Sequence, residues 1–263
     1  IEKQRILFVS HVGDIVDSNV PQQWKVAREA MDRLHGQVPY GLAVGNHDMK
    51  SDGDCSLFKE YFPASRFSQF DWYAEQYEDN ADSCQLFSAE GFDFVILHLE
   101  CNAPDDALAW ADEMLDRHAS RRAIVTTHMY LGPRDKPKDP RDYFDAPKGR
   151  MVWTKRHGSR GNSPQDMWEE CFQKHANLFM ICCGDQSRTQ TMHRTVRGVH
   201  DNPVHEVLCD YHEGSLRVYR FIPSEARIQA WTYRPREGEL CQGTKIVPDI
   251  DEHHFSLPCQ MKP

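Results

Sequence analysis

Several features that define common protein classes are missing from this sequence of 263 residues. No apolar run approaches the roughly 20 residues that a transmembrane helix needs, so we expect no membrane span. The formal net charge is −9, whereas proteins that bind a nucleic-acid backbone usually carry an excess of basic residues. We therefore expect no nucleic-acid partner. There is no Gly-x-Ser-x-Gly turn and no cysteine with an evident histidine partner, which leaves a serine or cysteine hydrolase without support. Internal repeats are also missing, so we expect one domain over residues 1–263, with a tail from about 237 to 263.

The nine cysteines include no Cys-x-x-Cys pair of the kind that binds zinc. Cys55 with Cys84, and Cys241 with Cys259, lie in polar, loop-like segments and are candidate disulfides. The alternative, that all the cysteines are reduced, agrees with the pattern equally well. Disulfides would favour a secreted protein, and nothing else in the sequence bears on localisation.

What the sequence does contain is a series of apolar strands that each run into a polar loop. The carboxyl ends of strands in an open α/β sheet meet where such sheets bind ligands, so we expect these loops to converge. Asp, Asn and His side chains together make a hard-to-borderline metal site. The strands at residues 6–9, 41–44, 123–127 and 178–183 are followed by Asp14, by Asn46, His47 and Asp48, by His128 and by Asp185.

The order of the elements predicts the fold class. Helical spacing of apolar residues at 24–34 and at 104–118 separates the first strands from one another. This alternation, followed by a β meander, predicts an α/β (α+β) fold with two facing sheets and helices outside. Residues 5–12 are apolar on both faces, which predicts an interior strand. The meander is predicted from residues 204–209, 216–221 and 228–233.

Three of the strand-to-loop junctions resemble motifs of the calcineurin-like metallophosphoesterase superfamily, in the same order. They are Gly13-Asp14-(x)2-Asp17, Gly45-Asn46-His47-Asp48 and Thr127-His128. The segments 202–205, 231–235 and 255–258 are similar to a bacterial-type branch of that family, so the resemblance covers almost the whole chain. It implies a four-layer metallophosphoesterase-type sandwich, with two mixed β-sheets flanked by helices, and hydrolysis of a small phosphorylated substrate.

Match to the motifs also implies roles for the residues. Asp14 would bridge two metals, and Asn46 and His128 would bind the second of them. His47 would face the substrate as general acid, and Asp48 would orient its imidazole. Two metals would clamp the phosphoryl oxygens and activate water. The divalent metal would be Mn, Fe or Zn, since carboxylate, amide and imidazole suit all three.

The sequence departs from the family pattern in two places. The family begins with a strand carrying an Asp-x-His-like motif, whereas only four residues precede Arg5 here. We therefore expect that strand to be missing and the sheet to show a gap or a substituted neighbour. The family's last motif is Gly-His-x-His, where this chain has Asp185 and Ser187 in place of the two histidines. Asp185 can bind a metal and Ser187 is a poor ligand. We therefore expect one retained metal site, and the alternative function is a degenerate member that binds a ligand or partner without turnover.

The remaining polar residues near these junctions have ordinary structural explanations. Asp17 is expected to act as a hydrogen-bond acceptor. His11, His98 and Glu100 lie in or beside strands, and we expect structural hydrogen bonds for each.

Overall fold

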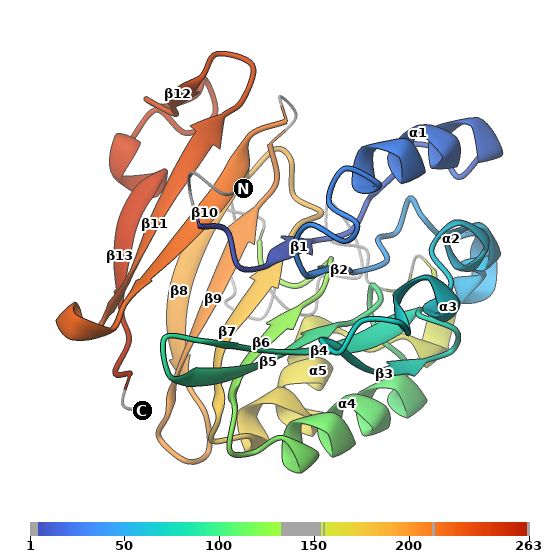
Figure 1. Cartoon of the computed structure of the whole chain (residues 1–263), viewed down its shortest axis with the longest axis horizontal. Helices are drawn as coiled ribbons and strands as arrows, with labels where there is room; N and C mark the ends of the chain where they lie inside the picture. The colour runs from blue at the N-terminus through green and yellow to red at the C-terminus, as the bar shows by residue number, and fades with distance from the viewer. Residues whose placement is uncertain (1–4, 133–153, 155, 212–213, 262–263) are drawn as a thin grey trace.

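The computed structural model describes residues 5–132, 154, 156–211 and 214–261 (Figure 1). The α-helices are α1 (Pro21–Met31), α2 (Ser56–Tyr61), α3 (Ala64–Phe67), α4 (Asp105–Arg117) and α5 (Pro164–Glu170). Short 3-10 helices are η2 (Ser51–Gly53), η5 (Gly158–Arg160), η6 (Phe172–Lys174), η7 (Pro223–Glu225) and η8 (Ile250–Glu252). The strands are β1 (Val9–His11), β2 (Tyr40–Leu42), β3 (Tyr73–Tyr77), β4 (Asp82–Ala89), β5 (Phe92–His98), β6 (Arg122–Thr126), β7 (Leu178–Cys183), β8 (Thr191–Arg197), β9 (Pro203–Cys209), β10 (Leu216–Ile222), β11 (Arg227–Arg234), β12 (Glu239–Leu240) and β13 (His254–Pro258).

A seven-stranded mixed sheet forms the centre of the molecule, in the order β3-β4-β5-β6-β7-β9-β8. The strands β5, β6, β7 and β9 are parallel, and antiparallel strands flank them on both sides. Helices α4 and α5 lie together on one face (Figure 1), where Leu108, Ala111 and Leu115 of α4 enter the main core. Because both faces of the central strands are covered, their sequences read as apolar runs. The predicted α/β class is confirmed.

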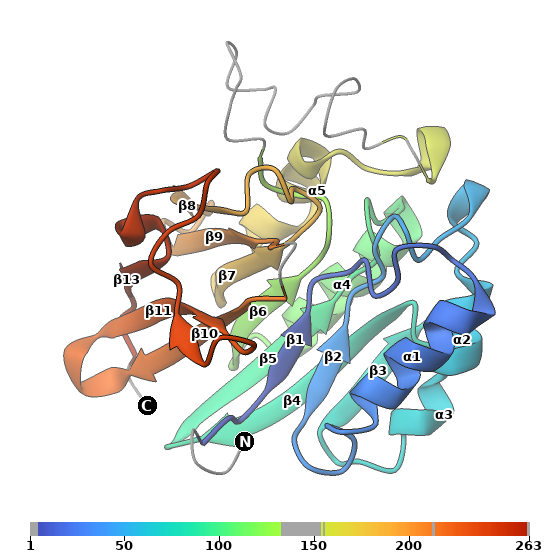
Figure 2. The ribbon, with the colours of Figure 1, turned by 90° about the horizontal axis from the view of Figure 1, so that it is seen from above.

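Two smaller sheets cover the other face of the central sheet. One is the parallel pair β1-β2, and the other is the antiparallel sheet of β10, β11, β12 and β13. In Figures 1 and 2, β1 lies between β10 and β2. Ile228 and Leu257 from the four-stranded sheet pack with Ile96, Phe179 and Val207 of the central sheet. The second layer is therefore held by an apolar interface of its own.

The prediction that residues 204–209 belong to the meander is wrong. This segment is β9, which pairs in parallel with β7 inside the central sheet. Val204 and Val207 are both fully or nearly fully buried, on opposite faces of β9. A strand covered on both faces carries no alternating pattern that would assign it to one sheet. Its neighbour β8, which pairs with it antiparallel, was not predicted.

The interior position predicted for residues 5–12 is also wrong. Strand β1 covers only Val9–His11, and among the described strands it pairs with β2 alone. Leu7, just before this strand, is 51% exposed, which does not agree with an interior strand covered on both faces. Contacts with the central sheet anchor the segment instead. Phe8 stacks on Phe87, with ring centroids 5.4 Å apart.

The predicted C-terminal tail is largely built into the second layer. Strand β12 pairs with one end of β11, and β13 pairs with β11 over five residue pairs. Leu257 of β13 is buried in the interface with the central sheet. Residues from 237 onwards therefore contribute to the core.

All nine cysteines are free thiols, so neither candidate disulfide is formed in the structure. Cys55, Cys84, Cys241 and Cys259 are each buried and are packed as small apolar side chains. In the part of the chain that the structure describes, no helix has both the length and the apolar character required to cross a bilayer.

Helix α5 begins with a capping box, and we expect its removal to destabilise the protein modestly. The Ser163 hydroxyl accepts a hydrogen bond from the backbone N–H of Asp166 at 3.2 Å, and the Asp166 carboxylate accepts one from the Ser163 N–H at 3.1 Å. Ser163→Ala should lower the free energy of unfolding by about 1 kcal/mol. Thermal unfolding should show a decrease in Tm of about 2–4 °C. Ser159→Ala, at an exposed position in η5, is the control, and an equal decrease there would contradict the role of the cap.

Candidate metal centre

The loops that follow β1, β2, β6 and β7 come together at one end of the sheets. Strands β1 and β2 lie side by side and point the same way (Figure 2). The loop after β6 is tied to the loop after β1, because the Nδ1 atom of His128 donates to the carbonyl oxygen of Val12 at 2.6 Å. It is tied to the loop after β7, because the Gly184 N–H donates to the His128 carbonyl at 2.9 Å. The strand ends thus bring the polar side chains predicted from the sequence into one region.

Two glycines allow these loops to approach so closely. A Cβ atom on Gly13, whose φ is +92°, would lie 2.5 Å from Nδ1 of His128. A Cβ atom on Gly45 would lie 2.1 Å from the backbone nitrogen of Asp14. Asp14 itself has φ 52°, in the left-handed region, which turns its carboxylate toward the neighbouring loops. Gly13 and Gly45 are therefore required at these positions, because a larger residue would collide with His128 or with the backbone of Asp14.

Asp14, His128 and Asp185 form the group that could hold a cation here. One potential ligand atom from each lies within 4.8 Å of the others. The Nε2 atom of His128 is 3.1 Å from Oδ1 of Asp14 and 3.6 Å from Oδ1 of Asp185. The same nitrogen is 3.2 Å from Oδ1 of Asn46, which is buried. The donor set around His128 Nε2 is thus two carboxylates and an amide oxygen.

These three groups shift one another's pKa values. Burial alone would lower the pKa of His128, but the carboxylate of Asp14 and then that of Asp185 raise it to about 10. Burial would raise the pKa of Asp14, yet the imidazolium of His128 and the hydrogen bonds to the carboxylate bring it to about 2. For Asp185 burial prevails over His128, and the pKa rises to about 6. A divalent cation would take the place of the imidazolium proton, because ligands must be deprotonated to bind.

His47 lies at the more exposed side of the centre. Its backbone N–H donates to Oδ1 of Asp14 at 2.8 Å. Its ring Nδ1 is 2.6 Å from the carbonyl oxygen of Asp17 and must carry a proton to make that bond. The Nε2 atom is then the ring nitrogen left to meet a substrate. Asp17 does act as an acceptor, through its backbone oxygen.

Asp48 does not make the contact that we expected with the His47 imidazole. Its carboxylate is fully buried and accepts hydrogen bonds from three backbone N–H groups, those of Gly45 at 2.8 Å, Ile15 at 3.1 Å and Val16 at 3.0 Å. Burial raises its pKa to about 7, although the three N–H donors favour the ionised form. Asp48 therefore joins the loops after β1 and β2 and positions the backbone that carries Asp14 and His47.

The structural hydrogen bonds expected for His98 and Glu100 are present. His98 bridges Oε1 of Gln85, at 2.7 Å, and the hydroxyl of Ser10, at 3.1 Å. The backbone N–H of Glu100 donates to Oδ1 of Asp82 at 2.7 Å, and the Oε2 atom of Glu100 lies 3.2 Å from Nε2 of His157. These contacts hold β1 and the loop after β5 to the central sheet.

His11 does not make the structural hydrogen bond that we expected for it. The buried Nδ1 atom of His11 has no hydrogen-bond partner among the described residues. Burial and then the charge of His128 lower its pKa to about 4, so its ring is neutral.

Cys101 was not predicted to lie near the centre. It is fully buried, and burial and then the carboxylates of Asp185 and Asp14 raise its pKa, so it lies in the electric field of the centre. Its position just after β5, at the same strand end, was the signal in the sequence.

The donor set fits a divalent cation. Carboxylate, amide and imidazole groups suit Mn, Fe and Zn, and the hydrogen bond from Nδ1 of His128 leaves Nε2 as the ligand atom. Ser187, where the family motif has its second histidine, is only partly buried and offers a hydroxyl. The residues that would hold the cation are Asp14, Asn46, His128 and Asp185.

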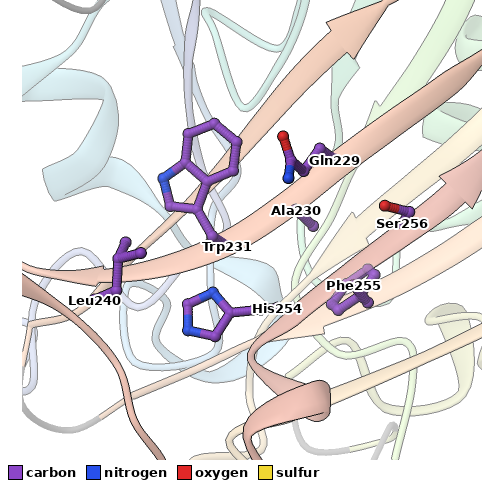
Figure 3. A pocket seen from close by; sticks show the side chains of 7 residues that line it. All are labelled: Gln229, Ala230, Trp231, Leu240, His254, Phe255 and Ser256. Carbon is purple, nitrogen blue, oxygen red and sulfur yellow. The ribbon is translucent and has the colours of Figure 1, made fainter. Parts of the chain in front are cut away.

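An open pocket of about 340 Å³ lies elsewhere, on the four-stranded sheet (Figure 3). Trp231 of β11 and His254 of β13 are paired across the strands at this place. None of the four candidate ligands lines the pocket, so it has no part in the centre. Its lining consists of Gln229, Ala230, Trp231, Leu240, His254, Phe255 and Ser256.

Comparison with known proteins agrees with the geometry of the centre. The profile of the family described as calcineurin-like phosphoesterase matches residues 1–185, which include every candidate ligand. An uncharacterised protein of Bacillus subtilis (strain 168), YvnB, is 28% identical over 272 residues, covering 98% of this chain and 19% of YvnB. This chain therefore spans about a fifth of the length of that relative. Because the profile matches 185 of the 263 residues, the chain belongs to the calcineurin-like phosphoesterase family.

Proposed function

We propose that this chain is a metal-dependent phosphoesterase-type hydrolase that acts on a small phosphate ester. The observation that carries the proposal is the convergence of Asp14, His128 and Asp185, whose ligand atoms lie within 4.8 Å of one another, beside His47. Family membership supports the same reaction class. The finer architecture is part of the proposal. The β1-β2 pair and the four-stranded sheet together would form the second sheet of a four-layer sandwich.

Each residue of the centre has a role in this proposal. Asp14, Asn46, His128 and Asp185 hold the cation. When bound, the metal polarises the phosphoryl group and lowers the pKa of the attacking water. His47 donates the proton from its Nε2 atom to the departing oxygen, while the carbonyl of Asp17 holds the ring by Nδ1. Asp48 fixes the backbone of both loops and so positions His47 and Asp14.

The metal content follows from the donors. Asp185 and Ser187 replace two histidines of the family pattern, so we propose that the centre holds one Mn, Fe or Zn ion instead of two. A single cation lacks half of the two-metal clamp on the phosphoryl oxygens, and turnover of a generic ester should be slow. The charge of −9 does not oppose an anionic substrate, because the cation supplies positive charge locally.

Hydrolysis of an aryl phosphate monoester and an aryl phosphate diester by the Mn-loaded protein tests this function. We expect slow, metal-dependent turnover that falls about 100-fold or more in His47→Gln, which removes a general acid. Elemental analysis should show the same Mn content in both proteins, because the His47 ring is not a ligand. His200→Gln, an exposed histidine outside the centre, should leave turnover unchanged. Turnover that persists in His47→Gln, or that needs no metal, would refute the assignment.

A second candidate function is binding of a phosphorylated ligand without turnover. The observation in its favour is the pair Asp185 and Ser187, since the family's Gly-His-x-His is replaced at this point. It predicts that the Mn-loaded protein binds inorganic phosphate, and that the wild-type protein and His47→Gln show equal, background hydrolysis. The two candidates therefore give opposite results in one assay.

A further inference from the structure

A second group of potential metal ligands lies at the opposite end of the central sheet. Asp112 and Asp116 belong to α4, and Cys171 and His175 flank η6, just before β7 begins at Leu178. Asp185 follows the other end of β7. Six strand residues separate the two ends by about 20 Å, so this group is distinct from the candidate metal centre.

The side chains of this group converge as metal ligands do. One potential ligand atom from each of Asp112, Cys171 and His175 lies within 4.8 Å of the others. The Nε2 atom of His175 is 3.0 Å from Oδ1 of Asp112. Asp112 and Asp116 are four residues apart in α4 and so lie on one side of the helix, while Cys171 and His175 stand at the two ends of the 3-10 helix η6.

The second nitrogen of the His175 ring is also engaged. Its Nδ1 atom is 3.4 Å from Oδ1 of Asp116. A metal-binding histidine commonly donates its other N–H to a carboxylate, which fixes the tautomer and makes the ligand nitrogen more basic. Asp116 is in that position relative to Nε2. Asp116 and His175 thus form a carboxylate–histidine pair, and the Nε2 atom of His175 faces the carboxylate of Asp112 and the thiol of Cys171.

The residues of this group differ in how far they are buried. Cys171 is fully buried and His175 is 4% exposed, whereas the side chains of Asp112 and Asp116 are 41% and 76% exposed. A cation could enter from the carboxylate side, and water could complete a four-coordinate shell. An ion pair between protonated His175 and the two carboxylates would explain the histidine contacts. Cys171 packs in the main apolar core, and its sulfur makes no hydrogen bond within the described part of the chain, so this ion pair would give the thiol no polar partner.

We propose that Asp112, Cys171 and His175 form a second metal site, for a thiophilic divalent cation of the zinc class, with Asp116 as a positioning residue. The sulfur selects this class, because thiolate ligands favour zinc over manganese. Binding displaces the thiol proton of Cys171, and any proton on Nε2 of His175, to the solvent. The cation links α4 to the segment that leads into β7, so its role is structural.

Cobalt(II) is the probe for this site, because a cobalt–thiolate bond gives a charge-transfer band in the near ultraviolet. The full-length, metal-stripped and reduced protein should develop this band, and the band should saturate by about two equivalents of cobalt, because the candidate metal centre can take up a second ion without giving the band. Cys171→Ser should abolish it. Asp112→Asn, at a partly exposed position that does not endanger folding, should weaken cobalt binding about 10-fold or more, and Asp116→Asn about 10-fold.

Two matched variants locate the cobalt. Cys241→Ser removes another buried cysteine and should leave the band unchanged. His128→Gln disables the candidate metal centre and should also leave it unchanged. The proposal is overturned if the wild-type protein shows no band at saturating cobalt, if the band survives in Cys171→Ser, or if it is lost in His128→Gln. Circular dichroism of Cys171→Ser, with native spectra required, separates loss of the site from loss of the fold.

Discussion

Replacing Asp48 with alanine is expected to destabilise the protein by about 3 kcal/mol or more. Three backbone N–H groups, two buried and one part-buried, lose their acceptor, and each buried one costs about 1–3 kcal/mol. The three donors belong to Gly45, Ile15 and Val16, so the change separates the loops after β1 and β2. Thermal unfolding should show a decrease in Tm of about 6–12 °C. The same variant should bind Mn weakly, because the backbone of Asp14 is no longer held.

Asp17→Ala is the control for Asp48→Ala, since it removes an exposed carboxylate from the same loop. It should change Tm by less than about 2 °C, as surface substitutions rarely exceed 0.5 kcal/mol. Asp48→Asn keeps one oxygen acceptor and should fall between the two. If Asp48→Ala and Asp17→Ala gave equal Tm values, the buried carboxylate would have no role in joining the loops.

Manganese is expected to raise the Tm of the wild-type protein, and His128→Gln is expected to remove most of that increase. A cation that binds only the folded chain stabilises it by about 2.7 kcal/mol at 100 times its Kd. For a chain of this size the increase should be about 5–11 °C. His128 supplies the nitrogen around which Asp14, Asn46 and Asp185 gather, so its loss should weaken Mn binding by at least about 100-fold.

Manganese is the suitable ion for this measurement because a thiolate-containing site disfavours it, and the response then reports the centre with oxygen and imidazole donors. His200→Gln should keep the full increase in Tm. Scans of both variants without metal give the baseline for each. An undiminished response in His128→Gln would show that Mn binds elsewhere in the protein.

The meeting of Asp14, His128 and Asp185 could be predicted because it depends only on where strands end. His128 and Asp185 follow the neighbouring parallel strands β6 and β7, whose ends share one edge of the central sheet, and Asp14 follows β1 in the facing β1-β2 pair. The contact of Asp48 could not be predicted in this way. The motif places it beside His47, but the direction of its carboxylate depends on the backbone at Ile15 and Val16, in another loop.

The sheet that a strand joins was equally hard to predict. Residues 204–209 and 216–221 have similar apolar content, yet β9 pairs with β7 and β10 pairs with β11. Strand propensity describes a single segment, whereas the choice of partner depends on what covers each face. The group of Asp112, Cys171 and His175 was not predicted for a related reason. Asp112 lies on the polar side of a predicted helix, and nothing in its own segment indicates a cysteine opposite.

The hydrogen bond from Nδ1 of His128 to the carbonyl of Val12 has a consequence for the kinetics and entropy of cation capture. The imidazole ring is already held in the orientation and tautomer that a bound ion would need. The Gly184 N–H and the His47 N–H hold the neighbouring loops in the same way. Ordering of these segments therefore takes place during folding, and an incoming ion has only to replace a proton.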